Sequence, residues 1–198
     1  MGSWTNESEW SWGEPAIKHL DSRAKKIYTK NLKVHFAKAD ELNRIAPTPE
    51  KGEQYVIITE KQFNAFALIC NLIENNIIDE IHLAIYRINQ PTVEAIINYI
   101  ESGKIKKGTF VISSFFNQTK KPEQWAIRLR EYCKQNKNFK HIYTHNHAKV
   151  LLARVKNDYY VFEGSGNMSD NARIEQYRYE NNKEVFEFHK DWMTQISE

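Results

Sequence analysis

Residues 147–167 read HAKVLLARVKNDYYVFEGSGN and combine two short polar motifs with a strand–turn–strand pattern. Apolar runs at 150–155 and 159–162 flank the turn residues at 156–158, which predicts a β-hairpin. Such a hairpin brings the start of its first strand beside the end of its second. The His-x-Lys pair that opens the stretch and the Gly-Ser-x-Asn turn that closes it are therefore expected to meet in space.

The residue types in these two motifs are those that bind anions. His147 and Lys149 stand two residues apart, so in a strand both side chains point to the same face. The histidine can act as a nucleophile or as an acid/base, while the lysine is a fixed cation. Ser165 and Asn167 add a hydroxyl and an amide, and the neighbouring glycines let backbone N–H groups approach a ligand. Together they predict a pocket for an anionic oxygen centre, most simply a phosphate.

Upstream of the hairpin, apolar runs alternate with amphipathic segments. Strands are expected at 55–59, within 77–88, at 109–116 and at 139–144, and helices at 61–75, 91–102 and 122–136. Pro91 suits the first turn of the second helix, and Gly103 suits the position just past its end. The β-α order with near-continuous apolar strands predicts an α/β fold, a three-layer α-β-α sandwich with a mixed, mostly parallel sheet and right-handed crossovers.

The two ends of the chain are expected to differ in organisation. A strand around 174–179 and a last helix follow the hairpin, and the expected inner face of that helix carries Val185, Phe188, Trp192 and Ile196. Residues 54–198 are expected to form the domain, and residues 1–53 an N-terminal arm and basic extension packed on it. Within the extension we expect a helix at 16–30 and a strand at 32–36. Its lysines and arginines predict a solvated face, or alternatively a phosphate contact.

The first residues carry three tryptophans, Trp4, Trp10 and Trp12. The arm is expected to be either loose or docked through tryptophan on its own domain or on a partner.

Length and composition restrict the class of protein. The 198 residues suffice for one domain with a sizeable core, and a formal net charge of +3 permits a phosphate-rich partner without requiring one. Cys70 and Cys133 lie on expected helix faces without a Cys-x-x-Cys motif, which predicts buried free thiols in a reducing compartment. No apolar run approaches the ~20 residues of a membrane span. Without a signal peptide at the start, a cytoplasmic protein is expected.

The two motifs and the element order together resemble the phospholipase D superfamily. The matching residues are His147-Ala-Lys149, Gly164-Ser-Gly-Asn167 and the following MSDNARIEQY, and the resemblance covers residues 55–198. It implies a phospholipase D-like fold and a phosphodiesterase that uses no metal and no cofactor. The chain departs from the pattern at Arg154, where the superfamily usually has Asp. Either Asp158, which lies nearby, substitutes for that acid, or the acid is absent.

The second departure is that the chain has only one His-x-Lys motif. Superfamily members with one copy resemble homodimers that build one active site from two motifs. The resemblance then implies that His147 of one subunit forms a phosphohistidine, while His147 of the other protonates the leaving oxygen and later activates water. Lys149 and Asn167 of both subunits would stabilise the non-bridging oxygens, assisted by Ser165.

A carboxylate should fix the tautomer of His147, and Glu175 is the first candidate by its place after the Gly-Ser-x-Asn turn, with Glu163 and Glu184 as fallbacks. An exposed charged residue at position 175 without any role is the alternative. The expected substrate-binding residues are Gly164, Gly166, Tyr86 and Arg87. For the last two, ordinary polarity at a strand end is the preferred explanation.

A zinc site made of Cys133, His141, His145 and His147 is a weaker alternative, because the spacing matches none of the usual zinc patterns.

The small size and the basic stretches favour a nuclease, with DNA or RNA as substrate and a second copy of the chain as partner. A phospholipid hydrolase or transferase of the same fold is one alternative. A catalytically silent nucleic-acid-binding module is another, and Arg154 favours it.

Overall fold

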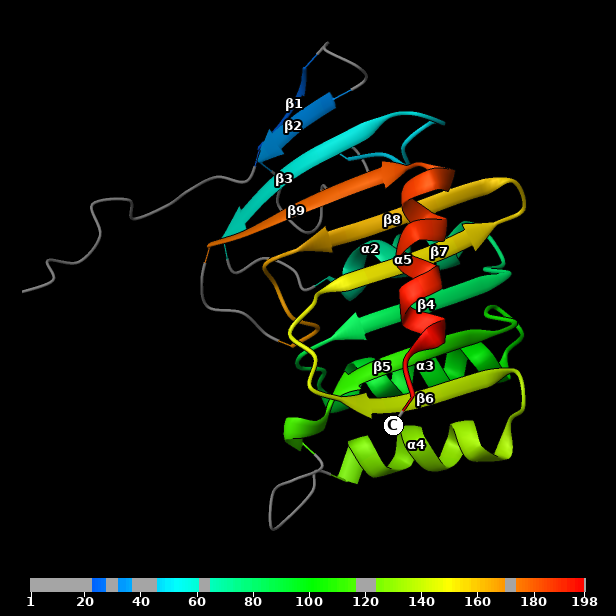
Figure 1. Ribbon diagram of the computed structural model, residues 1–198. Coiled ribbons are helices and arrows are strands. Elements are labelled where there is room, and N and C mark those ends of the chain that lie inside the picture. Colours follow the sequence, from blue (N-terminus) through cyan, green and yellow to red (C-terminus); the bar gives the residue numbers. More distant parts are fainter. Residues whose placement is uncertain are drawn as a thin grey trace, which may run out of the picture.

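A single mixed sheet is the centre of the molecule (Figure 1). The structure, a computed structural model, describes residues 23–27, 32–36, 46–60, 65–116, 124–169 and 174–197. In this part of the chain, nine strands lie in the order β1-β2-β3-β9-β8-β7-β4-β5-β6. Their bounds are Arg23–Ile27, Leu32–Phe36, Gln54–Glu60, Glu80–Ile85, Gly108–Ser113, Phe139–Thr144, Val150–Val155, Asp158–Gly164 and Ile174–Asn181 for β1 to β9. The helices are α2 (Phe66–Asn75), α3 (Gln90–Glu101), α4 (Gln124–Gln135) and α5 (Lys183–Gln195).

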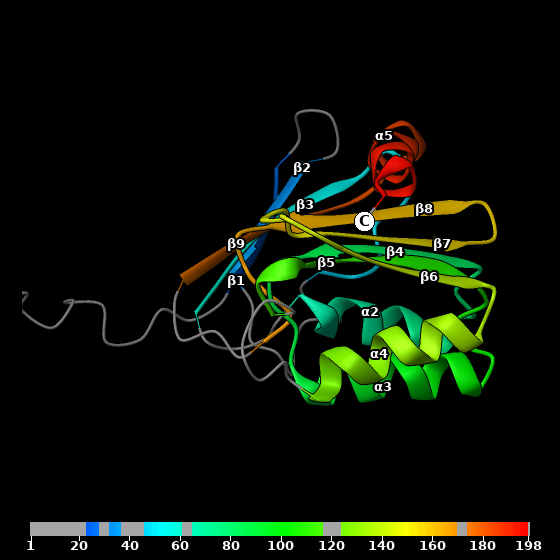
Figure 2. The same cartoon turned by 60° about the horizontal axis from the view of Figure 1, so that its bottom comes forward.

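The helices cover both faces of the sheet, which confirms the expected three-layer α-β-α class. Figure 2 shows α2, α3 and α4 on one face and α5 on the other. The larger apolar core lies between the sheet and the three helices, and a second cluster around Phe186 and Met193 lies under α5. Every residue of β4 and β5 is buried. This explains why both strands are near-continuous apolar runs.

The sheet is mixed, but the expectation that it is mostly parallel is wrong. Three strand pairings are parallel and five are antiparallel. The helices α3 and α4 connect β4, β5 and β6 as parallel neighbours, as the β-α pattern predicts. Short connections join β7, β8 and β9, and strands joined in this way pair antiparallel.

The helix α3 follows the sequence prediction closely. The side chain of Asn89 accepts a hydrogen bond from the Thr92 backbone N–H and caps the helix, and Pro91 occupies the first turn. Its expected inner face is buried as a whole: Val93, Ile96, Ile97 and Ile100. Gly103 follows the helix end with a φ of +72°, a conformation that favours glycine.

The inner face of α5 is only partly the expected one. Phe186 and Met193 are the buried residues of this helix, while Val185, Trp192 and Ile196 pack partly buried around them. Phe188 was expected inside, but its side chain is exposed.

The N-terminal extension contributes strands to the sheet. Residues 23–27 are the strand β1, so the helix expected over 16–30 is wrong there, whereas the expected strand at 32–36 is confirmed as β2. β1 pairs with β2, and β2 pairs parallel with β3. Trp4, Trp10 and Trp12 lie outside the described residues.

Both cysteines are free thiols; Cys133 is buried, whereas Cys70 is only half-buried. Within the described ranges, no helix has the length and apolar character needed to cross a membrane.

Candidate active site

The His-x-Lys motif lies in the loop between β6 and β7. Residues 145–149 are not part of a strand, so the strand geometry expected for His147 and Lys149 is wrong. The two side chains nevertheless lie together, because Lys149 Nζ is 3.4 Å from His147 Nδ1 and donates to the His147 carbonyl oxygen at 3.1 Å. The expected pairing of a histidine with a fixed cation is therefore present.

The hairpin that was expected to join the two motifs is confirmed. β7 and β8 pair antiparallel with Val150 opposite Glu163. The Gly164 N–H donates to the Lys149 carbonyl oxygen at 3.1 Å. This register places the Gly-Ser-x-Asn turn beside the His-x-Lys motif.

Ser165 and Glu175 form a hydrogen-bonded pair at this point. Ser165 Oγ donates to Glu175 Oε2 and accepts from the Gln176 backbone N–H at 3.0 Å. Glu175 was expected to accept a hydrogen bond from the ring of His147. Within the described part of the chain, its hydrogen bond is with Ser165 instead. Partial burial lowers the pKa of the Lys149 ammonium, and the negative charge of Glu175 opposes that shift.

Asn167 connects the turn to the end of β4. The Arg87 backbone N–H donates to Asn167 Oδ1 at 3.1 Å, and the Met168 N–H donates to the Arg87 carbonyl oxygen at 3.0 Å. The exposed residue Arg87 therefore meets the site through its backbone. The ring of Tyr86 lies closer to the motif, with its centroid 4.8 Å from that of His147 and 5.9 Å from Lys149 Nζ.

An open cavity of about 590 Å³ lies over these residues. Its lining comprises His147, Ala148, Lys149, Val150, Glu163, Gly164, Ser165, Gln176, Tyr177 and Arg178. Gly166, Asn167, Glu175, Tyr86 and Arg87 are not in the lining. Glu175 nevertheless bonds to Ser165, and the Tyr86 ring lies against His147.

The two glycines of the turn are explained by the close approach of β9. A Cβ at Gly164 would overlap the Gln176 carbonyl oxygen, and a Cβ at Gly166 would overlap the hydroxyl of Tyr177. Gly166 is buried under this ring. Packing therefore requires glycine at both positions, whether or not their N–H groups also bind a ligand.

Glu163, a fallback candidate for orienting His147, lines one wall of the cavity and contacts two residues that the sequence prediction missed. Arg178 NH1 lies 3.2 Å from Glu163 Oε1, and His189 Nε2 lies 3.3 Å from Glu163 Oε2. The hydrogen bond from His189 lowers the pKa of Glu163 most, and burial opposes it. The alternation of exposed residues along β9 could have revealed Arg178, because it lies on the same face as the cavity residue Gln176.

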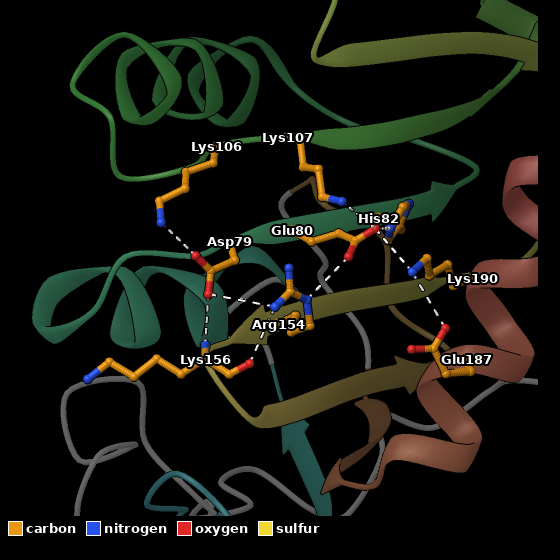
Figure 3. Close-up of polar contacts among 9 residues, drawn as sticks. All are labelled: Asp79, Glu80, His82, Lys106, Lys107, Arg154, Lys156, Glu187 and Lys190. Atoms are coloured by element: carbon orange, nitrogen blue, oxygen red, sulfur yellow. Dashed lines mark hydrogen bonds and ion pairs between the residues drawn. The ribbon is translucent and has the colours of Figure 1, made fainter.

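Arg154 lies at the opposite end of β7, in a separate charged cluster (Figure 3). Its Nε is 3.3 Å from Glu80 Oε2, and its NH1 is 3.9 Å from Asp79 Oδ2. Asp158 also lies away from the site, at the β7–β8 turn, where it accepts from Asn181 Nδ2 at 3.0 Å. Of the two alternatives for the missing acid, substitution by Asp158 is therefore wrong.

The centre of the charged cluster is the buried carboxylate of Glu80. His82 Nε2 lies 2.9 Å from it, and the ammonium groups of Lys190 and Lys107 lie at 3.3 and 3.6 Å. Burial alone would raise the pKa of Glu80, but the hydrogen bond from His82 and these positive charges lower it to about 2. The cluster therefore stabilises an ionised carboxylate at the end of the sheet away from His147.

The structure gives no support to the zinc alternative. Among the residues that the structure describes, no group of three or more His, Cys, Asp or Glu side chains could hold a metal ion. Cys133 and His141 line another pocket, between α4 and β6, and His145 Nδ1 lies 3.5 Å from Ser114 Oγ.

No protein-family model and no curated protein matches the sequence. Among solved structures, the chain is similar to polyphosphate kinase from Porphyromonas gingivalis, with a TM-score of 0.55 and 17% identity over 74% of this chain and 26% of the kinase. At this level of identity the likeness shows a shared fold alone, and it confirms the expected α/β fold class.

Two further structures match at lower TM-scores. TrmBL2, an archaeal chromatin protein, gives 0.47 with 14% identity over 71% of this chain and 51% of that one. Phosphatidylserine synthase from Haemophilus influenzae Rd KW20 gives 0.43 with 11% identity over 71% and 38%. The chain thus spans from about a quarter to about half of these proteins.

Proposed function

We propose that this chain is a phospholipase D-like phosphodiesterase that cleaves nucleic acid through a phosphohistidine. One observation carries the proposal: a histidine, a lysine and a serine that is hydrogen-bonded to a glutamate line one open cavity of about 590 Å³ at the ends of the strands. Ligands in α/β sheets usually bind at such strand ends. The shared fold with a polyphosphate kinase, an enzyme whose name states phosphoryl chemistry, supports the same reading.

In the proposed reaction, a ring nitrogen of His147 attacks phosphorus and the bond from phosphorus to the leaving oxygen breaks. A proton donor neutralises that oxygen as it departs. Water then attacks the phosphohistidine, the P–N bond breaks, and the donor takes the proton of the water. Lys149 lies next to the ring and stabilises the charge on the non-bridging oxygens. The Ser165–Glu175 pair fixes the turn opposite the histidine.

A second copy of the chain is proposed to supply the proton donor. The donor in this scheme is the partner's His147, because the motif occurs once in the sequence. A two-fold axis beside the cavity would place both histidines on one phosphate, and two-fold dimers are the commonest oligomers. His189 does not line the cavity, and both of its ring nitrogens have partners: Nε2 lies 3.3 Å from Glu163 Oε2, and Nδ1 accepts from Trp192 Nε1 at 3.1 Å. We therefore do not assign His189 as the donor.

The test compares wild-type protein with His147→Ala on single-stranded DNA, duplex DNA, RNA and a phosphatidyl substrate, each with and without EDTA. We expect EDTA-resistant cleavage of nucleic acid that His147→Ala abolishes. His189→Ala is the matched control and should keep most of the activity. Hydrolysis of the phosphatidyl substrate alone would indicate a lipid enzyme. Equal inactivity of both proteins, together with salt-dependent DNA binding, would indicate the silent binding module.

The shared site has its own test. The mass in solution should be twice the 23.4 kDa of the chain. In dimers assembled from mixtures of wild-type and His147→Ala subunits, activity should fall as the square of the wild-type fraction, because each site needs both histidines. A linear decrease, or an active monomer, would contradict the shared site.

A further inference from the structure

Three rings form a row beside the cavity, and the outermost is open to solvent. The ring centroids of Phe115 and Tyr86 are 6.0 Å apart with an interplanar angle of 31°, and those of Tyr86 and His147 are 4.8 Å apart. Phe115 is 55% exposed. A large exposed aromatic side chain therefore lies two ring contacts from the proposed nucleophile.

The fold places these rings at one edge of the sheet. Tyr86 follows β4 directly, Phe115 lies in the short 3-10 turn after β5, and His147 follows β6. These three strands are parallel neighbours, so the segments that leave their carboxyl ends meet at the same edge. The strand order therefore brings the three segments that carry these rings to one place beside the histidine.

Positive charge lies along the same row. Lys149 Nζ is 3.4 Å from His147 Nδ1 and 5.9 Å from the centroid of the Tyr86 ring. Proteins that bind single-stranded nucleic acid combine cationic groups for the backbone with aromatic side chains on which bases stack. The bases of a duplex are already stacked on each other and do not offer a free face to a protein ring.

Resting on the proposed function, we infer that Phe115, supported by Tyr86, is a stacking platform for a nucleobase next to the scissile phosphate. The substrate class is then single-stranded nucleic acid. The phosphate binds at His147 and Lys149, and a neighbouring base lies on Phe115. A second phenylalanine with an exposed side chain, Phe188, lies on α5 and is the matched control.

The experiment measures binding by fluorescence anisotropy in a cleavage-blocked His147→Asn background. The probes are a short oligothymidylate and an abasic oligonucleotide with the same number of phosphates. Phe115→Ala should weaken oligothymidylate binding about 10-fold, in line with the loss of one stacked base, and leave abasic binding unchanged. Phe188→Ala should change neither. A complementary strand that converts the probe to duplex should weaken binding to the wild-type surface.

The outcomes separate this inference from the proposed function. If wild-type protein cleaves DNA but Phe115→Ala binds both probes as before, the phosphodiesterase stands and the platform is refuted. If Phe115→Ala converts a dimer to a monomer, the ring belongs to the subunit interface, and the platform is also refuted. If wild-type protein neither binds nor cleaves either probe, the nuclease proposal itself fails.

Discussion

Replacing Arg154 by Asp introduces the acid that the phospholipase D pattern usually has at this position, and we expect this change to destabilise the protein without improving catalysis. Arg154 Nε contacts Glu80 Oε2 at 3.3 Å, and the side chain of Glu80 is only 7% exposed. Asp79 lies on the other side of the guanidinium. Arg154→Asp therefore removes a cation from two carboxylates and adds a third carboxylate beside them.

The magnitude follows from what remains around Glu80. Removing one partner of a fully buried ion pair costs about 3–5 kcal/mol. Glu80 keeps its contacts with His82, Lys107 and Lys190, and the Arg154 side chain is 26% exposed. The loss of the Arg154–Glu80 pair should therefore cost no more than the lower end of that range of free energies. A new negative charge at roughly 8 Å adds about 2 kcal/mol at an effective dielectric constant of 20. The sum is about 4 kcal/mol, or roughly 10 °C in Tm for a chain of this size.

Urea unfolding followed by tryptophan fluorescence measures this difference, and a phosphodiesterase assay on the same preparations measures catalysis. Lys106→Ala is the control within the same cluster. Its ammonium contacts Asp79 at 2.7 Å but is 58% exposed, so it should cost less than about 1 kcal/mol. The reasoning is refuted if Arg154→Asp is as stable as wild type, or if it raises activity.

Three further changes test other parts of the molecule. The pKa of Glu80 is about 2 in the folded protein against an ordinary 4.5, so its contribution to stability is complete above pH 4.5 and is lost as the pH falls toward 2. In Glu80→Gln, the free energy of unfolding, measured with urea at a series of pH values, should fall less between pH 4.5 and 2 than in wild type. An unchanged fall would contradict this assignment. Burial raises the pKa of the Cys133 thiol to about 12, so in a Cys70→Ser protein a thiol reagent should modify it only at the rate of unfolding, and rapid labelling of the native protein would contradict its burial. Gly166→Ala should lower the free energy of unfolding by about 1–3 kcal/mol, because the added Cβ would overlap Tyr177. The control is Gly103→Ala, whose added Cβ lies in open space and should cost only the strain of the positive φ.

Local patterns in the sequence predicted the elements well, because their signals are carried by neighbouring residues. The strand at 139–144 and the inner face of α3 follow directly from periodicity and from Pro91 and Gly103. Periodicity did not decide which face of α5 packs on the sheet, because apolar residues occur on more than one side of this helix. Phe188 fits the same spacing as Trp192, but the core contacts Phe186 and Met193.

The strand order could not be predicted in the same way, because it depends on contacts between distant segments. The sequence alternates strands and helices from β3 onward, and this pattern favours β3 and β4 as parallel neighbours in the sheet. The structure instead places β9 beside β3 and β7 beside β4, both antiparallel.

The candidate site was predicted as far as the hairpin determines it. The meeting of Lys149 with Gly164 follows from turn position and strand length, which are local. The partner of Glu175 could not be predicted, because it depends on how β9 approaches the turn at Ser165. The exposed ring of Phe115 was missed because residues 109–116 were expected to form a buried strand, in which an apolar side chain lies inside.

The place of β9 in the sheet has a consequence for how the chain folds during synthesis. β9 follows the other strands of this sheet in the sequence, yet it separates β3 from β8, and its Glu180 accepts a hydrogen bond from Gln54, 126 residues away. The inner edge of β3 therefore stays open on the nascent chain until the C-terminal segment has left the ribosome. Contacts over such long separations form slowly, and an open apolar edge is prone to pair with other chains. A chain that stops before residue 174 would keep the β7–β8 hairpin but leave the first three strands without the strand that joins them to it.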